Sequence, residues 1–377
     1  MKIAIDCADL DNSRIDGTRV YIKQLLDWFG KLDRKNKFLL YHRRDFNELL
    51  KPNNFKNYTD KKIPPHWWWT QTVFAADLRY ELPDICWMPI QQVPFIGPKK
   101  TKYVVTIHDL AFKFFPAHFP KTDLYKLNFF TDSAIKRADK IIAISDATKK
   151  DILKLYPKVN EKKIFVIHHG FDVKHFLRRR TDEEILRVRK ELKIANDTKR
   201  RYLLYVGALQ PRKNLITLIR AFEVIKKNKK FNELRLVLAG EQAWMSEETI
   251  VAAQESVNKK DIILTDRVDF EQLAALYQSA EIFVYPSLYE GFGIPILEGL
   301  ASRVPVVTAN NSSLPEVGGD AVELFESENH QALADVLLKI MKSYKIKERM
   351  IKRGASHVKK FSWEKSAKKT LEVLMSE

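Results

Sequence analysis

Short runs of apolar and β-branched residues alternate with longer amphipathic stretches along most of the chain. Such runs are typical of buried parallel strands, and the stretches between them have helical spacing. The pattern therefore predicts an α/β protein in which helices cross parallel sheets. We expect strands at Lys2–Ile5, Phe38–Tyr41, Ile85–Met88, Tyr103–Ile107, Lys140–Ile144 and Ile164–Ile167 in the first half, and at Tyr202–Val206, Leu234–Ala239, Ile262–Leu264, Ile282–Tyr285 and Val304–Thr308 in the second.

The predicted strands fall into two series, and 377 residues exceed what one hydrophobic core commonly serves. Helices are expected at Val20–Trp28, at Ala147–Leu155 after a cap at Ser145, and at Asp182–Lys193. We predict two Rossmann-like, doubly wound domains facing a cleft. Their bounds are 1–172 for an N-terminal domain, 173–200 for a basic connector and 201–360 for a C-terminal domain, with a last helix in 361–377.

The composition indicates the cellular compartment of the protein and bears on whether it binds a metal. No apolar stretch is long enough for a membrane span, and Asp6 interrupts the first apolar run too early for a signal-peptide core. Cys7 and Cys86 lie beside predicted strands, so we expect buried, reduced thiols in a cytoplasmic protein. Asp9-Leu10-Asp11 has an Asp-x-Asp spacing, but such triplets arise by chance among 48 acidic residues, so we interpret it as surface loop and predict no metal site.

Positive charge is concentrated in the first half of the chain. Residues 1–200 hold 40 Lys and Arg against 25 Asp and Glu, within a net charge of +17. An anionic partner, either nucleic acid or lipid headgroups, would explain the excess. A generally lysine-rich composition would explain it as well. In the same half, Pro64-Pro65-His66-Trp67-Trp68-Trp69 is a candidate aromatic edge for a membrane or a sugar, although ordinary core packing would account for at least one of the tryptophans.

The strongest candidate for chemistry follows the predicted strand Ile282–Tyr285. There Glu290 and Glu298 bracket seven residues that include Gly291, Phe292 and Gly293. The glycines let backbone N–H groups approach a ligand, and Glu298 falls on the next helix near the same loop. Paired carboxylates can accept hydrogen bonds from a hydroxyl-rich ligand. The alternative is that the two glutamates lie on the surface, flank a turn and have no function.

A second candidate follows the predicted strand Tyr202–Val206. Gly207 opens a loop that ends in Arg212 and Lys213, just before a helix with apolar residues at helical spacing. A guanidinium, an ammonium and a helix N-terminus directed at a diphosphate would stabilise the charge that grows as the diphosphate leaves. An exposed Arg-Lys pair is more commonly a solvated surface when it stands alone.

Together these two elements, about eighty residues apart, resemble retaining glycosyltransferase family 4, in its mannosyltransferase-like branch. The resemblance spans nearly the full length and implies a GT-B fold. In that fold, 1–172 would be the acceptor-binding domain, 201–360 the donor-binding domain, and the helix in 361–377 would pack back on the first domain. It implies that Glu290 contacts donor sugar hydroxyls near the anomeric centre, that Glu298 binds the ribose, and that Arg212 and Lys213 bind the diphosphate.

Other positions match the family less completely. His108 ends the predicted strand Tyr103–Ile107 and resembles the family histidine that meets the donor sugar. Gly17 resembles the glycine loop near the distal phosphate, although Arg19 replaces a second glycine. Arg267 and Val268 correspond to the loop that meets the nucleotide base, where relatives have glycine in place of Asp266. Relatives also commonly have glycine in place of Arg303.

The resemblance implies transfer of a hexose with retention, from a nucleoside diphosphate sugar and without a cofactor. GDP-mannose is the favoured donor, and UDP-glucose or a similar hexose donor is the alternative. The expected acceptor is a polysaccharide or a lipid-linked glycan, reached by a protein peripheral to the inner face of an anionic membrane. A basic nucleic-acid-binding protein remains the alternative of another class, although it would leave the paired glutamates unexplained.

Overall fold

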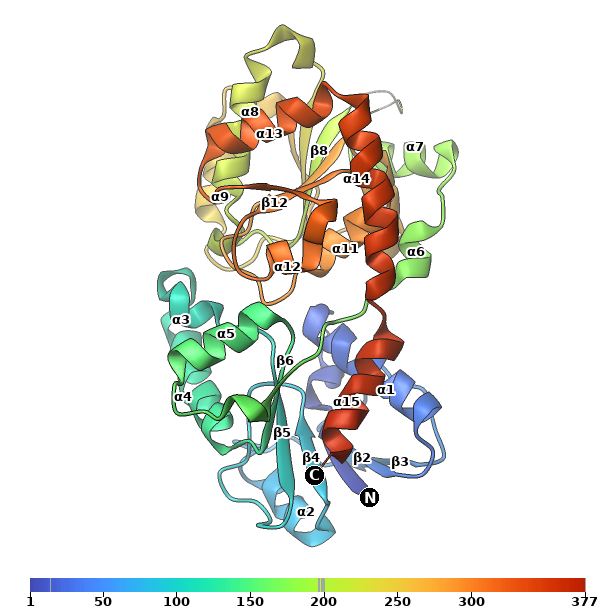
Figure 1. Cartoon of the computed structure of the whole chain (residues 1–377), viewed down its shortest axis with the longest axis vertical. Coiled ribbons are helices and arrows are strands. Elements are labelled where there is room, and N and C mark those ends of the chain that lie inside the picture. Colours follow the sequence, from blue (N-terminus) through green and yellow to red (C-terminus); the bar gives the residue numbers. More distant parts are fainter. Residues whose placement is uncertain (14, 196, 198–200, 377) are drawn as a thin grey trace. The chain divides into compact units, whose positions relative to one another are not determined.

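The chain forms two compact α/β units. The computed structural model describes residues 1–13, 15–195, 197 and 201–376. Unit 1 comprises Met1–Phe114, Lys121–Gly170 and the chain from Phe361 onward, and unit 2 comprises Phe115–Pro120 and Phe171–Lys360. The fold predicted from the sequence, with two Rossmann-like parallel sheets, is confirmed (Figure 1).

Unit 1 is built on a seven-stranded parallel sheet of order β3-β2-β1-β4-β5-β6-β7. Its strands are β1 Lys2–Asp6, β2 Lys37–His42, β3 Tyr58–Lys62, β4 Ile85–Met88, β5 Lys102–Ile107, β6 Lys140–Ala143 and β7 Ile164–Val166. The sequence pattern located all of these except β3, whose residues Tyr-Thr-Asp-Lys-Lys are polar because the strand lies at the edge of the sheet.

The helices of unit 1 begin where side chains can satisfy free backbone N–H groups. Asp16 caps α1 by accepting from the N–H of Arg19, and Ser145 caps α5 by accepting from the N–H of Thr148, as predicted for Ser145. The α-helices of this unit are α1 Gly17–Leu32, α2 Val73–Glu81, α3 Ala111–Phe114, α4 Lys121–Arg137, α5 Asp146–Leu155 and α15 Trp363–Met375.

The last helix of the chain is part of the core of unit 1. Helix α15 packs beside α1 (Figure 1), and Trp363, Leu371 and Leu374 are buried in the same apolar cluster as residues of β1 and α1. The backbone of Trp363 also lies so close to Gly170 that a side chain at Gly170 would collide with it. The core of unit 1 therefore combines β1 and α1 with α15.

Unit 2 is built on a six-stranded parallel sheet of order β10-β9-β8-β11-β12-β13. Its strands are β8 Tyr202–Val206, β9 Arg235–Ala239, β10 Ile262–Leu264, β11 Ile282–Tyr285, β12 Val306–Ala309 and β13 Glu323–Phe325. β13 is a short edge strand that the sequence pattern did not indicate. Its α-helices are α6 Val173–Leu177, α7 Asp182–Glu191, α8 Leu215–Lys226, α9 Glu247–Glu255, α10 Phe270–Ser279, α11 Ile294–Ala301, α12 Leu314–Gly318, α13 His330–Met341 and α14 Tyr344–His357.

The segment expected as a connector, 173–200, contributes α6 and α7 to unit 2, and its residues 196 and 198–200 lie outside the described part of the chain. Thr181 and Glu184 form a capping box at the start of α7, and Phe176 and Val188 are buried. Among the helices of the described residues, none is long and apolar enough to cross a bilayer. The two cysteines, Cys7 and Cys86, are buried and unbonded to each other, as predicted.

Candidate functional site

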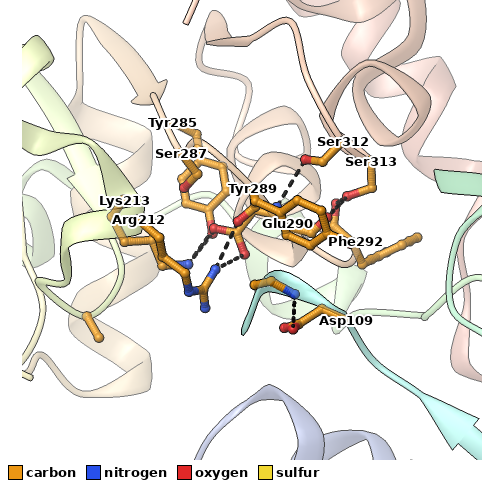
Figure 2. Close-up of polar contacts among 12 residues, drawn as sticks. Asp109, Arg212, Lys213, Tyr285, Ser287, Tyr289, Glu290, Phe292, Ser312 and Ser313 are labelled. Carbon is orange, nitrogen blue, oxygen red and sulfur yellow. Dashed lines mark hydrogen bonds and ion pairs between the residues drawn. The ribbon is translucent and has the colours of Figure 1, made fainter. Parts of the chain in front are cut away.

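In unit 2, the loops after β8 and β11 bring three charged side chains together. Because β8 and β11 are neighbouring parallel strands, the loops at their carboxyl ends open on the same edge of the sheet. The β8 loop ends in a short 3-10 turn, Pro211–Lys213, and the β11 loop carries Glu290. Figure 2 shows Arg212 and Lys213 directed at the Glu290 carboxylate.

Each oxygen of the Glu290 carboxylate has its own cation. Nη1 of Arg212 donates to Oε2 at 3.1 Å and to the Tyr289 carbonyl at 3.0 Å. Nζ of Lys213 donates to Oε1, and the Tyr285 hydroxyl donates to the same oxygen at 2.9 Å. Burial alone would raise the pKa of the Glu290 carboxyl, but Lys213 and Arg212 outweigh it and lower the pKa to about 2. Glu290 is therefore a buried carboxylate anion and a weak base.

Two serines hold the loop that carries Glu290. The backbone N–H of Glu290 donates to the Ser312 hydroxyl at 3.0 Å, and the Ser313 hydroxyl donates to the carbonyls of Glu290 and Phe292 at 2.9 and 2.8 Å. Phe292 itself is buried. Sequence reasoning missed Tyr285, Ser312 and Ser313. The available signal was the polar run after the apolar strand β12, whose carboxyl end lies next to that of β11.

Glycines shape both loops. Gly207 and Gly293 have positive φ angles of +146° and +106°, and Gly293 directly precedes α11. Gly293 therefore lets the chain turn into α11 close to Glu290. Gly291, between Glu290 and Phe292, is buried.

Glu298 lies on α11, as the sequence predicted, and it is in a less charged environment than Glu290. The Tyr277 hydroxyl donates to its Oε2 at 2.9 Å. Burial raises the pKa of the Glu298 carboxyl to about 7, and the bond from Tyr277 only partly offsets this effect. The two glutamates of one motif therefore differ in protonation near neutral pH.

The loop after β10 holds Arg267, which is exposed, and Val268, which is half-buried. Asp266 has a φ of +55° and Arg303 a φ of +62°. Both non-glycine residues thus adopt the left-handed conformation that glycine adopts freely, at two positions where the family commonly has glycine.

In unit 1, His108 follows β5 and lies in an aromatic cluster. Its ring is 5.1 Å from that of Tyr21 and 5.7 Å from that of His169. Nε2 of His108 is 2.8 Å from the Pro89 carbonyl, so Nε2 carries the hydrogen and donates. Burial lowers the pKa of His108 below its ordinary value. His108 is therefore a neutral imidazole whose Nδ1 has an acceptor lone pair.

Gly17 is the first residue of α1. Arg19, two residues later, contacts the loop that precedes this helix. Arg19 donates from Nε to the Asp9 carbonyl at 3.1 Å and forms an ion pair with Asp16. The surface-loop interpretation of Asp9-Leu10-Asp11 was wrong, because these residues belong to a 3-10 helix, Ala8–Asp11, in which Leu10 is buried and Asp11 forms an ion pair with Arg43. Beside this helix lies a polar cavity of about 510 Å³ lined by Asp11, Asn12, Ser13, Arg43, Arg44 and Pro65.

Comparison with known proteins covers both units. The profile of the family described as Glycosyltransferase Family 4 matches residues 16–175, and that of Glycosyl transferases group 1 matches residues 188–357. O-antigen chain mannosyltransferase B of Escherichia coli is 29% identical over 277 residues, which are 74% of this chain and 71% of that protein. O-antigen chain mannosyltransferase RfbU of Salmonella typhimurium is 29% identical over 222 residues, which are 58% of this chain and only 55% of that protein.

Solved structures agree on the fold. Anabaena Alr3699/HepE, solved with UDP and glucose, superposes over all of both chains with a TM-score of 0.74 at 16% identity. WaaG, a glycosyltransferase of lipopolysaccharide biosynthesis, also superposes over all of both chains, with a TM-score of 0.73 at 13% identity. Because two family profiles together account for most of both units and the architecture matches, this chain belongs to glycosyltransferase family 4 and is a glycosyltransferase of the GT-B fold.

Proposed function

We propose that the protein is a retaining hexosyltransferase that moves mannose from GDP-mannose to a polysaccharide or lipid-linked acceptor. The observation that carries the proposal is the buried contact of Glu290 with Arg212 and Lys213 on the loops after β8 and β11. It gathers, on one sheet edge, cations suited to a diphosphate and a carboxylate suited to sugar hydroxyls.

In this proposal, Arg212 and Lys213 receive the diphosphate of the donor. Each cation already neutralises one oxygen of Glu290, and each has further N–H groups that can donate to phosphate oxygens. As the bond between the anomeric carbon and the diphosphate oxygen breaks, negative charge grows on that oxygen. Donors held in place before the reaction stabilise this charge without reorganising.

Glu290 accepts hydrogen bonds from donor sugar hydroxyls in this account, and it acts as neither nucleophile nor base. Its low pKa and its two cations support that assignment, because a paired carboxylate is a poor proton acceptor. The acceptor oxygen then bonds to the anomeric carbon on the face that the diphosphate leaves, and the acceptor proton passes to the departing diphosphate oxygen. Retention follows without a covalent enzyme intermediate.

The remaining predicted residues are given roles toward the same donor. We assign Glu298 to the ribose, the loop positions Gly207, Gly291, Phe292 and Gly293 to the phosphates and sugar, and Arg267 with Val268 to the base. Unit 1 holds Gly17, which we assign to the distal phosphate on the basis of the family resemblance. It also supplies His108, whose Nδ1 is suited to accept from a sugar hydroxyl because its Nε2–H is committed to Pro89.

GDP-mannose is favoured over a UDP-hexose because two of the similar curated proteins are O-antigen mannosyltransferases. The UDP-hexose alternative is supported by the fold neighbour solved with UDP and glucose. For the acceptor we assign the polar cavity beside the 3-10 helix Ala8–Asp11, whose Asn, Ser and Arg side chains can bind hydroxyls or an anionic group. The proposed place of action is the cytoplasmic face of a membrane. The nucleic-acid-binding alternative has no structural observation in its favour.

A thermal-shift panel of nucleoside diphosphate sugars tests the donor assignment. A donor present at 100 times its dissociation constant should add about 2.7 kcal/mol of stability. We expect GDP-mannose to raise the melting temperature most, and an α-linked product to form when acceptor is added. A larger shift with UDP-glucose would favour the alternative donor. Formation of a β-linked product from that α-linked donor sugar would contradict retention.

A further inference from the structure

Exposed aromatic and aliphatic side chains gather on three segments of unit 1. Trp67 and Trp68 of the loop after β3 are 75% and 48% exposed, and Ile96 of the loop between β4 and β5 is 64% exposed. On helix α4, Tyr125 and Phe129 are 77% and 46% exposed. Such a concentration of large apolar groups in water is unfavourable unless a partner covers it.

Ring contacts join these segments into one surface. Trp67 stacks on Trp68 with ring centroids 5.1 Å apart, and Trp68 meets the edge of Phe130 at 6.5 Å. Phe95 lies 5.5 Å from Phe129 and 6.4 Å from Phe130. We call the surface formed by Trp67, Trp68, Phe95, Ile96, Tyr125, Phe129 and Phe130 the aromatic face.

Buried and hydrogen-bonded neighbours hold the aromatic face in place. Trp69 is buried, stacks on Phe74 and donates from Nε1 to the Ile63 carbonyl at 3.1 Å. Gln71 ties the two loops together by accepting from the N–H of Phe95 at 2.7 Å and donating to the Val93 carbonyl at 3.2 Å. Trp68 has a φ of +52°, a costly conformation for a bulky residue. These contacts therefore fix the position of the exposed pair Trp67 and Trp68.

Exposed basic residues neighbour members of the aromatic face along the chain. Lys121, Tyr125 and Phe129 are four residues apart along α4, so they share one side of the helix, and all three are exposed. Lys126 is exposed on the same helix, and Lys99 and Lys100 are exposed just beyond Ile96.

The nearby acid on this turn of α4, Asp123, lies three positions before Lys126 and can offset that lysine, but it does not offset Lys121. Asp123 lies two positions from both Lys121 and Tyr125, so it points away from them. A surface that combines aromatic rings with lysines complements an anionic bilayer, in which tryptophan and tyrosine favour the headgroup region and lysines favour the lipid phosphates.

We propose that the aromatic face docks unit 1 on an anionic lipid bilayer, with Trp67, Trp68, Ile96 and Phe129 at headgroup depth and Lys99, Lys100 and Lys126 against the lipid phosphates. Ile96 and Phe129 favour a bilayer over a glycan, because neither offers a polar group to a sugar hydroxyl. The proposal extends the lipid-linked acceptor of the proposed function, but its test measures binding and needs no sugar transfer.

The test is co-sedimentation of the full chain with vesicles of phosphatidylcholine, alone or mixed with phosphatidylglycerol. We expect binding only to the mixed vesicles, weakening as salt rises. The triple variant Trp67→Ser, Trp68→Ser, Phe129→Ser should lower the partition coefficient at least about tenfold, and so should Lys99→Gln, Lys100→Gln, Lys126→Gln. The matched control is Tyr344→Ser, a change at an exposed aromatic residue of unit 2 that should leave partitioning unchanged.

Unchanged melting temperature and nucleotide binding would show that the triple variants are folded. The proposal is overturned if wild type ignores anionic vesicles, or if either triple variant binds them as wild type does. It is also overturned if the aromatic triple variant loses binding to a soluble polysaccharide and keeps binding to vesicles, since the face is then a glycan platform. Vesicle binding by a chain that turns over no nucleotide sugar would refute the proposed function and leave this proposal standing.

Discussion

At the scale of single residues, the charge of the buried Glu290 carboxylate is compensated by its neighbours. A buried carboxylate is costly unless it is paired and hydrogen-bonded, and here Lys213, Arg212 and Tyr285 occupy its oxygens. The same cations are the groups we assign to the diphosphate. In the structure, the carboxylate of Glu290 holds these two cations in place.

Arg212→Ala should lower the rate of sugar transfer by about 100- to 1,000-fold, the scale for deleting one preorganised donor from a site of developing charge. The measurement is kcat/KM with the best donor of the thermal-shift panel. Arg349→Ala is the matched control, because Arg349 belongs to the same unit and forms only a partly exposed ion pair with Glu323. Near-normal transfer by Arg212→Ala would reject the role assigned to the guanidinium.

Glu298→Gln should change the pH dependence of stability. Burial raises the pKa of the folded-state carboxyl to about 7 from an ordinary value of 4.5, so the folded wild type takes up a proton that the unfolded chain lacks between these values. Stability from this group is therefore lost as pH rises through about 7. Against wild type, the variant should gain on the order of 1 kcal/mol of unfolding free energy between about pH 5 and pH 8.

Urea unfolding at several pH values checks this gain, and parallel curves for the two proteins would contradict it. Nucleotide affinity gives an independent readout. If the Glu298 carboxylate binds the ribose, the affinity of wild type should rise with pH through about 7, while that of Glu298→Gln should stay flat.

At the scale of elements, the loops of the site depend on how closely β8 and β9 approach. Gly240, at the end of β9, has a φ of +154°, and an added Cβ would collide with the Gly207 carbonyl. Gly207 in turn opens the loop that carries Arg212 and Lys213. The position of the cationic pair is therefore set partly by a glycine outside the predicted site.

Gly240→Ala should cost about 2 kcal/mol of unfolding free energy and weaken nucleotide binding, because the collision is with backbone and cannot be relieved by a rotamer change. Chemical denaturation and calorimetric titration with GDP measure the two effects. For stability, Gly17→Ala is the contrast, since an added Cβ there meets no atom within 4 Å and should change stability by less than about 0.5 kcal/mol. Equal stability of the two variants would contradict this account of the β8 loop.

Sequence reasoning located most elements and part of the site for a physical reason. Buried strands such as β4 are apolar throughout, so they stand out, whereas β3 at a sheet edge is polar and β13 begins with Glu323 and has only two apolar residues. Glu290, Arg212 and Lys213 were predicted from loops that follow strong strand patterns. Tyr285 and Tyr277 were not predicted. A tyrosine in an apolar run is typical of a buried core, and only the structure shows that these two hydroxyls donate to glutamates.

At the scale of the whole molecule, the last residues of the chain complete the first unit. Trp363 is buried against Tyr21 and His169, whose ring centroids lie 6.2 and 5.8 Å away, in the cluster that also holds His108. No local sequence pattern indicates these contacts, because their partners lie far apart along the chain. The resemblance alone implied that the last helix returns to unit 1.

Trp363→Ala should lower the unfolding free energy of unit 1 by about 3 to 5 kcal/mol, since it empties a large buried volume. Trp67→Ala, an exposed tryptophan of the same unit, is the control and should cost less than about 0.5 kcal/mol. Denaturation followed by fluorescence and circular dichroism measures both. A small loss for Trp363→Ala would mean that unit 1 is stable without its last helix.

The central claim is that the carboxylates and cations of unit 2 bind one nucleotide sugar. A crystal structure of the protein soaked with GDP-mannose tests it most directly. We predict the diphosphate against Arg212 and Lys213, the sugar hydroxyls on Glu290 and the ribose on Glu298. A nucleotide sugar bound elsewhere, with the Glu290 cluster unchanged from the free protein, would contradict the account.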